Sequence, residues 1–177
     1  ICPFVLEAHA ASIRPADKRF DFVYVASAEP HKNHTKLLEA WCLLAQQNIR
    51  PSLALTVQKD SPLSMMIDRL AEQWQLNLVN LGHISALEVS ALYDQSAALI
   101  YPSTTESLGL PLIEAHERQL PIIAAELDYV RDIVVPVETF DPESHVSIAR
   151  AVKRHLGMAE YCQPMYGPEA FLEEVLR

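Results

Sequence analysis

The sequence predicts an α/β protein whose parallel β-sheet carries helices on both faces. Short apolar segments alternate with amphipathic segments along the chain, and the short segments lack the regular polar alternation of a half-exposed strand. Strands that are apolar on both sides are typical of parallel sheets lying between two layers of helices. The chain has 177 residues, half of them hydrophobic, which is the size of one compact domain.

Six apolar runs supply the predicted strands. In order along the chain they lie at residues 22–26, 53–57, 76–81, 97–101, 121–125 and, as the shortest, 138–140. Because amphipathic segments separate the runs, we expect the strands to run parallel, and ligands of such sheets bind beyond the carboxyl ends of the strands. The loops that should hold a site are residues 27–33, 58–61, 82–85, 103–110 and 126–129.

The amphipathic segments between these runs supply the predicted helices. Ser61 caps a helix whose first residue is Pro62, and Ser85 with Glu88 forms a capping box at the start of the next helix. Each helix is expected to bury one apolar face against the sheet. In order, the helices are predicted at residues 34–47, 61–74, 85–93, 110–118, 129–133 and 144–156.

The alternation of strands and helices covers residues 20–157, which we predict to be one domain. Residues 1–19 are expected to be a linker or N-terminal extension, and residues 158–177 a tail with a short helix. The chain begins at Ile1 rather than at a methionine, so we expect it to be a piece of a longer protein.

Charge and composition argue against several classes of protein. The formal net charge of −9 argues against non-specific binding of nucleic acid and against binding of anionic lipid through a polybasic segment. No apolar run approaches the ~20 residues of a membrane span. Cys2, Cys42 and Cys162 lie far apart and are expected as free thiols in a reducing, cytoplasmic compartment. No set of residues has metal-ligand spacing, so we expect no metal.

The segment 101–115 carries the most specific chemistry. It leaves a predicted strand, turns at Gly109 and starts a helix with Pro111 near the first position. The backbone N–H groups of residues 107–110 would then point outward at the positive end of a helix dipole. Such a helix start binds an anion without any basic side chain, and a diphosphate suits it.

Two glutamates flank this turn. Glu114 is expected in the first turn of the helix, where its carboxylate can accept hydrogen bonds from the vicinal hydroxyls of a ribose. Glu106 lies on the loop before the turn, on the other side of the expected phosphates, and suits the hydroxyls of a sugar attached to them. Taken alone, two acids at this spacing are more often a solvated face than a ligand site.

The whole string carries more weight than the two acids. Pro-Ser-x-x-Glu-Ser-x-Gly-Leu-Pro-x-x-Glu-Ala, from Pro102 to Ala115, resembles the Glu-x7-Glu signature of the family-4 retaining glycosyltransferases, long called glycosyl transferases group 1. The resemblance implies a Rossmann-like fold, namely the C-terminal domain of a GT-B enzyme. It implies that Glu106 binds hydroxyls of the donor sugar and that Glu114 holds the ribose. It also implies backbone contacts to the diphosphate and sugar from Ser107, Leu108, Gly109 and Leu110.

Two other segments resemble the same family. Residues 78–84 match the strand and turn that contact the nucleobase, largely through backbone atoms, with Gly82 and His83 in the turn. His83 is as well explained as a polar turn residue. Residues 25–38 match the first strand, loop and helix, in which Lys32 corresponds to the lysine that binds the donor diphosphate. The resemblance covers residues 20–157.

The resemblance implies a retaining hexosyltransferase that uses a nucleoside-diphosphate sugar as its donor substrate and needs no cofactor. Lys32 and the helix start would stabilise the departing diphosphate as charge builds in the transition state. The acceptor, a saccharide or lipid-linked saccharide, would be bound by an N-terminal domain outside this chain. We therefore expect the chain alone to bind donor weakly and to turn over little. The whole enzyme is expected to be cytoplasmic, with peripheral association at the inner face of the membrane.

The sequence also departs from the family pattern. Where the family has Gly-Arg, this chain has Ala26-Ser27, so one diphosphate-binding cation is absent. Either His31, His34 or an arginine elsewhere compensates, or stabilisation of the leaving group is weaker. This departure supports an alternative, a non-catalytic nucleotide-sugar-binding module on a GT-B scaffold. Retention of both motif glutamates argues against that alternative, and no lysine has the sequence context of a pyridoxal-binding phosphorylase.

Overall fold

A computed structural model of the chain describes residues 18–158. Nearly all of the predicted N-terminal extension and of the predicted tail, with its short helix, therefore lies outside the described residues. The strands are β1 (Phe20–Tyr24), β2 (Leu53–Leu55), β3 (Leu78–Asn80), β4 (Ser96–Tyr101), β5 (Ile122–Ala125) and β6 (Glu138–Phe140). The helices are the 3-10 turn η1 (Pro30–Lys32), α1 (His34–Gln46), α2 (Pro62–Trp74), α3 (Ala86–Asp94), α4 (Leu110–Glu117), α5 (Asp128–Arg131) and α6 (His145–His155).

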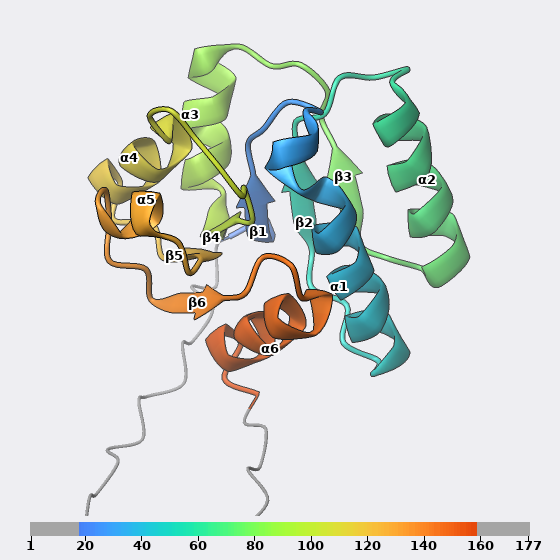
Figure 1. The fold of residues 1–177 in the computed structure, drawn as a ribbon. Coiled ribbons are helices and arrows are strands. Elements are labelled where there is room, and N and C mark those ends of the chain that lie inside the picture. The colour runs from blue at the N-terminus through green and yellow to red at the C-terminus, as the bar shows by residue number, and fades with distance from the viewer. Residues whose placement is uncertain (1–17, 159–177) are drawn as a thin grey trace, which may run out of the picture.

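The strands form one six-stranded sheet in the order β3-β2-β1-β4-β5-β6 (Figure 1). Every neighbouring pair is parallel, which confirms the predicted α/β fold with its Rossmann-like sheet. The strand order reverses between β1 and β4, because the chain builds outward from β1 in one direction and then crosses to β4 to build in the other. Ligands of open α/β sheets bind beyond the carboxyl ends of the strands at such a reversal, which here lies between the loops that follow β1 and β4.

Helices cover both faces of the sheet. Helix α1 packs against α2 and α6 on one face, and α3 and α4 lie on the opposite face, where both contact β4 (Figure 1). This arrangement explains why the central strands are apolar on both sides. In β1, every residue is buried.

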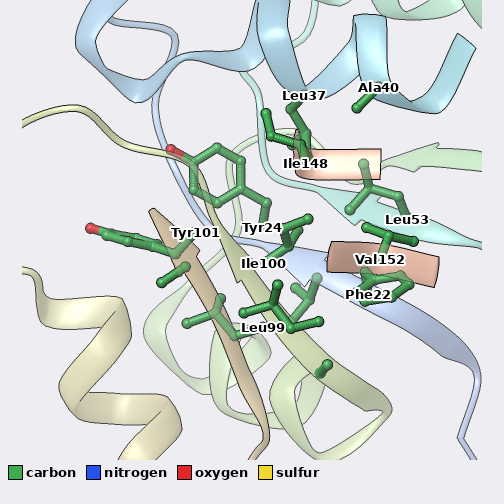
Figure 2. Packing of buried hydrophobic residues seen from close by; sticks show 14 of the residues in the cluster. Phe22, Tyr24, Leu37, Ala40, Leu53, Leu99, Ile100, Tyr101, Ile148 and Val152 are labelled. Atoms are coloured by element: carbon green, nitrogen blue, oxygen red, sulfur yellow. The ribbon is translucent and has the colours of Figure 1, made fainter. Parts of the chain in front are cut away.

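The core lies between β1, β4 and the helices above them (Figure 2). Phe22 meets the indole of Trp41 edge to face, with 5.6 Å between the ring centroids. The indole N–H of Trp41 donates to the carbonyl oxygen of Pro51 at 3.0 Å, so its burial leaves no polar group unpaired. Trp41 is thus part of the core.

The ends of the strands differ from the prediction by at most two residues. β1 begins at Phe20 and ends at Tyr24, because its pairing with β2 stops where Tyr24 meets Leu55. Val25 and Ala26 continue the apolar run beyond the pairing. β3 is shorter than its apolar run and only half-buried, since it is the edge strand and pairs with β2 alone. Hydrophobicity thus marked the strands well and their ends poorly.

His34, the first residue of α1, is buried rather than exposed. Its ring lies against Tyr24 with 4.9 Å between the ring centroids. It is 4% exposed, and neither ring nitrogen has a hydrogen-bond partner in the described chain. Burial lowers the pKa of His34 to about 4, so the ring is neutral near pH 7. The structure therefore does not support His34 as the cation that compensates for the absent arginine.

We expect acid to destabilise the protein through His34. The unfolded chain binds a proton at His34 near pH 6.5, whereas the folded chain resists protonation until about pH 4. Stability from this residue is complete above pH 6.5 and is lost as the pH falls toward 4, by about 3 kcal/mol at most. Urea unfolding of His34→Leu at several pH values should show a flatter profile than the wild type over this window. The exposed His116→Leu variant serves as the control, and equal slopes for wild type and His34→Leu would contradict the prediction.

Candidate functional site

Two loops meet at the carboxyl edge of the sheet, one after β1 and one after β4. The N–H of Thr104 donates to the carbonyl oxygen of His31 at 2.8 Å. The side-chain amide of Asn33 donates to the carbonyl oxygens of Pro102 and Pro142, at 3.2 and 2.8 Å. Asn33 has a left-handed backbone conformation with φ 58°, which an asparagine tolerates better than most residues. These contacts hold the two loops side by side.

Lys32 and Glu106 form an ion pair between these loops. The Lys32 Nζ lies 2.8 Å from Oε1 and 2.9 Å from Oε2 of Glu106. The lysine side chain is 17% exposed and the glutamate side chain 10%. Burial opposes ionisation of Glu106, but hydrogen bonds from Lys32, Ser103 and Tyr101 outweigh it and hold the pKa of Glu106 below its ordinary value. The two residues that the sequence analysis assigned to catalysis are therefore in direct contact.

Three tyrosines support this pair, and sequence reasoning missed them. The Tyr101 hydroxyl donates to Glu106 Oε1 at 2.8 Å. Tyr24 donates to the carbonyl oxygen of Lys32 at 2.7 Å and lies 2.9 Å from Ser103 Oγ, and Tyr129 donates to the carbonyl oxygen of Ser103 at 2.6 Å. Burial raises the pKa of all three tyrosines, so they remain hydroxyl donors. A signal was present, because β1 and β4 each end in a tyrosine at the edge where ligands bind.

Gly109 makes the turn into α4 as predicted. It has φ 63° and lies at the N-cap, and the helix begins at Leu110. A Cβ at this position would lie 2.9 Å from Cδ1 of Ile133, so the turn has neither the conformation nor the room for a side chain. Within the described residues, the backbone N–H groups of positions 107–110 donate to no other residue. They are available for an anion.

Glu114 lies one turn further along α4 than predicted. It is the fifth residue of the helix and so belongs to the second turn, because α4 begins at Leu110. The carboxylate is half-buried, and its Oε2 accepts a hydrogen bond from the hydroxyl of Tyr93 at 3.1 Å. Tyr93 is buried, but its hydroxyl makes a polar contact with a motif glutamate.

An open pocket of about 370 Å³ lies at the ends of β1, β2 and β3, and its lining does not include Lys32, Glu106, Gly109 or Glu114. Of the predicted site residues, His83 lines it. The neighbouring Gly82 has φ 76° and packs against the aliphatic part of Lys59, and its N–H donates to Asn80 Oδ1 at 3.2 Å. Its lining residues are Ser27, Ala28, Glu29, Thr56, Gln58, Ser61 and His83, and all of them except Thr56 lie in three of the loops that the sequence analysis selected.

The position of the absent arginine is occupied by a hydroxyl and a carboxylate. The Ser27 hydroxyl donates to Glu29 Oε2, and both residues are exposed in the pocket. No arginine contributes to the lining of this pocket. Arg131 pairs with Glu126 at 2.7 and 2.5 Å. Within the described residues, Lys32 is the cation that contacts Glu106, and no arginine lines the pocket in place of the absent one.

No metal cluster or membrane helix is evident in residues 18–158. Within this range, histidine, cysteine, aspartate and glutamate side chains form no group of three or more that could hold a metal ion. No helix of the described part has both the length and the apolar composition to cross a bilayer. Cys42 is a free, half-buried thiol, and the other two cysteines lie outside the described residues.

Comparison with known proteins places this geometry in a family. The family model described as glycosyl transferases group 1 matches residues 7–166. The chain belongs to this family. The group 1 glycosyltransferase chain is also 32% identical over 142 residues to the serotype-specific mannosyltransferase WbdA of Escherichia coli. It is 25% identical over 148 residues to the O-antigen chain mannosyltransferase RfbU of Salmonella typhimurium.

The matches differ in how much of each protein they cover. The WbdA match covers 78% of this chain but 17% of WbdA, and the RfbU match covers 80% of this chain and 40% of RfbU. Among solved structures, the C-terminal domain of the group 1 glycosyltransferase LpcC from Francisella tularensis superposes with a TM-score of 0.65 at 17% identity. That match covers 77% of this chain and 75% of the LpcC domain. The chain therefore shares the GT-B fold of its structural neighbours and spans a minor part of its curated relatives.

Proposed function

We propose that this chain is the donor-binding domain of a retaining glycosyltransferase, which transfers a hexose from a nucleoside-diphosphate sugar. The observation that carries the proposal is the contact between Lys32 and Glu106 beside the start of α4. In this arrangement an ammonium group and free backbone N–H groups would bind a diphosphate. The carboxylate next to them would accept hydrogen bonds from the hydroxyls of the attached sugar. The retaining outcome follows from the family-4 resemblance.

The charge arrangement suits departure of a diphosphate. Lys32 is held at the carboxyl edge of the sheet by the hydrogen bond that Tyr24 donates to its backbone carbonyl, and positive charge at that point stabilises the negative charge that develops on the leaving group. A donor that enters would draw the ammonium from Glu106 toward phosphate. The carboxylate would then be left to accept hydrogen bonds from the sugar.

The pocket beside Glu29 suits the nucleoside part of the donor. A volume of about 370 Å³ can take a nucleobase with part of its ribose, and its walls combine backbone with polar side chains such as Gln58 and His83. Backbone groups of Gly82 would face the base, and Glu114 would hold the ribose from α4. We infer mannose as the transferred sugar from the mannosyltransferase relatives, and surface polysaccharide as the product class.

Donor binding by the chain tests the proposal. Isothermal titration calorimetry with GDP-mannose, UDP-glucose and ADP-glucose should detect weak binding of at least one of them by the 177-residue chain. The corresponding nucleosides, which lack phosphates, should produce no heat. Absence of binding to every nucleotide sugar, both by the chain and by the whole protein that contains it, would overturn the proposal.

The alternative of a non-catalytic binding module has one observation in its favour. Ser27 stands at the position where the family has a diphosphate-binding arginine, and its hydroxyl donates to Glu29, so the leaving group has less positive charge around it. Sugar transfer and nucleotide-sugar hydrolysis by the whole protein distinguish the two functions. A protein that binds the donor but neither transfers nor hydrolyses its sugar would favour the binding module. The same proposal includes an acceptor-binding domain outside this chain and peripheral association of the whole enzyme with the inner face of the membrane.

Removing the carboxylate of Glu29 should strengthen donor binding. Glu29 lines the pocket next to the expected diphosphate, and two like charges at short range repel each other. We expect Glu29→Gln to lower the dissociation constant for a nucleoside diphosphate by about threefold to tenfold at low salt, and by less at 0.15 M salt. Calorimetry at the two salt concentrations measures this. Glu72→Gln on α2 makes the same change in net charge outside the pocket lining, so equal effects of the two variants would contradict the prediction.

A further inference from the structure

A buried tyrosine stands behind each of the two motif glutamates. Tyr101 donates to Glu106 and Tyr93 donates to Glu114, at 2.8 and 3.1 Å. Both tyrosines are 1% exposed, whereas both carboxylates reach the surface in part. Each glutamate is thus held from the protein side and left accessible from the solvent side.

The contact of Tyr101 is built to persist when a donor enters. Tyr101 is the last residue of β4, is paired with Ala124 of β5, and lies edge to face against Tyr24 with 5.8 Å between the ring centroids. Figure 2 shows the two rings with their hydroxyl groups directed away from the apolar cluster. The Tyr101 hydroxyl donates to Oε1 of Glu106, while Lys32 contacts both carboxylate oxygens. Movement of Lys32 toward phosphate would free Oε2 for the sugar, with Oε1 still held.

The contact of Tyr93 fixes the other glutamate in the same way. Tyr93 lies in the last turn of α3 and packs beneath the guanidinium of Arg118, 5.6 Å from its ring centroid. That arginine donates to Ser90 of α3 at 2.8 Å and to the carbonyl oxygen of Glu114 on α4 at 3.0 Å, so it joins the two helices. The tyrosine hydroxyl occupies Oε2 of Glu114 and leaves Oε1 for a ligand hydroxyl.

We propose that Tyr93 and Tyr101 are positioning residues that orient the nucleoside-binding and the sugar-binding glutamate, respectively. This inference rests on the proposed function. A carboxylate on a free glutamate side chain samples several rotamers, and ordering it on binding costs free energy. A tyrosine hydroxyl fixed in the core orders the glutamate side chain when the protein folds. Each glutamate is therefore already oriented when the donor arrives.

Removal of the two tyrosine hydroxyls should weaken the binding of different ligands. Tyr101→Phe acts through the glutamate for the sugar, so it should weaken binding of the nucleotide sugar about tenfold and leave binding of the nucleoside diphosphate within about twofold of the wild type. Tyr93→Phe acts through the glutamate for the ribose, so it should weaken binding of both ligands by a similar factor. A general loosening of the fold would not separate the ligands in this way.

Calorimetry on the chain tests this with the nucleotide sugar that binds most tightly among GDP-mannose, UDP-glucose and ADP-glucose, and with its nucleoside diphosphate. Each tyrosine variant is measured alone and on top of alanine at its own glutamate, Glu106→Ala or Glu114→Ala. If each tyrosine acts through its glutamate, its substitution has no further effect once that glutamate is alanine. Val152→Ala, in α6 and away from the site, controls for lost stability and should bind both ligands as the wild type does.

The outcomes separate the inference from the function on which it rests. Ligand-selective loss for Tyr101→Phe, loss of both ligands for Tyr93→Phe, and no further effect in the alanine backgrounds would support it. Wild-type affinity in both phenylalanine variants would overturn it, as would losses that persist in the alanine backgrounds. A wild-type chain and a whole protein that bind no nucleotide sugar would overturn the proposed function and the inference together.

Discussion

Replacing Lys32 with methionine should lower the rate of sugar transfer by about 100-fold to 1000-fold, the usual effect of removing one group that stabilises developing negative charge. The lysine is the cation that the structure places against Glu106, and no arginine lines the neighbouring pocket. The substitution also leaves the mostly buried carboxylate of Glu106 without its counter-ion, which disfavours the ionised form that the sugar requires. Product formation by the whole protein carrying this change measures the effect.

A second lysine close in sequence provides the control. Lys36 lies four residues further on, in α1, and pairs with Glu39 at 2.8 Å on the surface. Lys36→Met is the same substitution and removes the same charge. We nevertheless expect near wild-type transfer, because an exposed ion pair contributes little. Transfer at the wild-type rate by Lys32→Met would show that the leaving group departs without this lysine.

Replacing Gly109 with valine should have the second large effect, on both stability and donor binding. The backbone at this position has φ 63°, and the new side chain would collide with Ile133, whose Cδ1 lies 2.9 Å from an ideal Cβ. A β-branched residue in the left-handed region costs about 1–3 kcal/mol. Relief of that strain would rotate the turn before α4, so that its N–H groups no longer converge on a diphosphate. We expect a lower midpoint of urea unfolding and at least a tenfold loss of nucleoside-diphosphate affinity.

Gly157 separates these two effects. It has φ 70° just beyond α6, outside the residues assigned to donor binding. Gly157→Val imposes a similar backbone strain and should lower stability while leaving nucleotide affinity unchanged. If Gly109→Val and Gly157→Val bind the nucleotide equally well, the turn at Gly109 has no part in the site.

The helix starts show how far local sequence reasoning reaches. The predicted cap at Ser61, with Pro62 as the first helical residue, is present, and the Ser61 hydroxyl accepts the N–H of Ser64 at 3.1 Å. The predicted capping box of Ser85 and Glu88 is also present. These signals depend on side chains within three residues of the backbone groups that they satisfy, so no distant part of the chain can override them easily.

The burial of single residues was harder to predict. His34 follows a lysine and an asparagine in a polar stretch, and its sequence context resembles a surface loop. The structure buries it against Tyr24 because the loop after β1 folds back over the end of its own strand. Glu114 lies in the second turn rather than the first although the helix begins at Leu110 as predicted, because it is the fifth residue of that helix.

By itself, the sequence determined the order of strands and helices, the layered α/β class and the motif around Gly109, because each depends on periodicity or on neighbours within a few positions. The tertiary structure alone decided which side chains meet. Lys32 and Glu106 are 74 residues apart, and Tyr93 and Glu114 are 21 apart on different helices. Such contacts arise only after parallel pairing brings the carboxyl ends of β1 and β4 to one edge, and no local pattern encodes the rotamers that result.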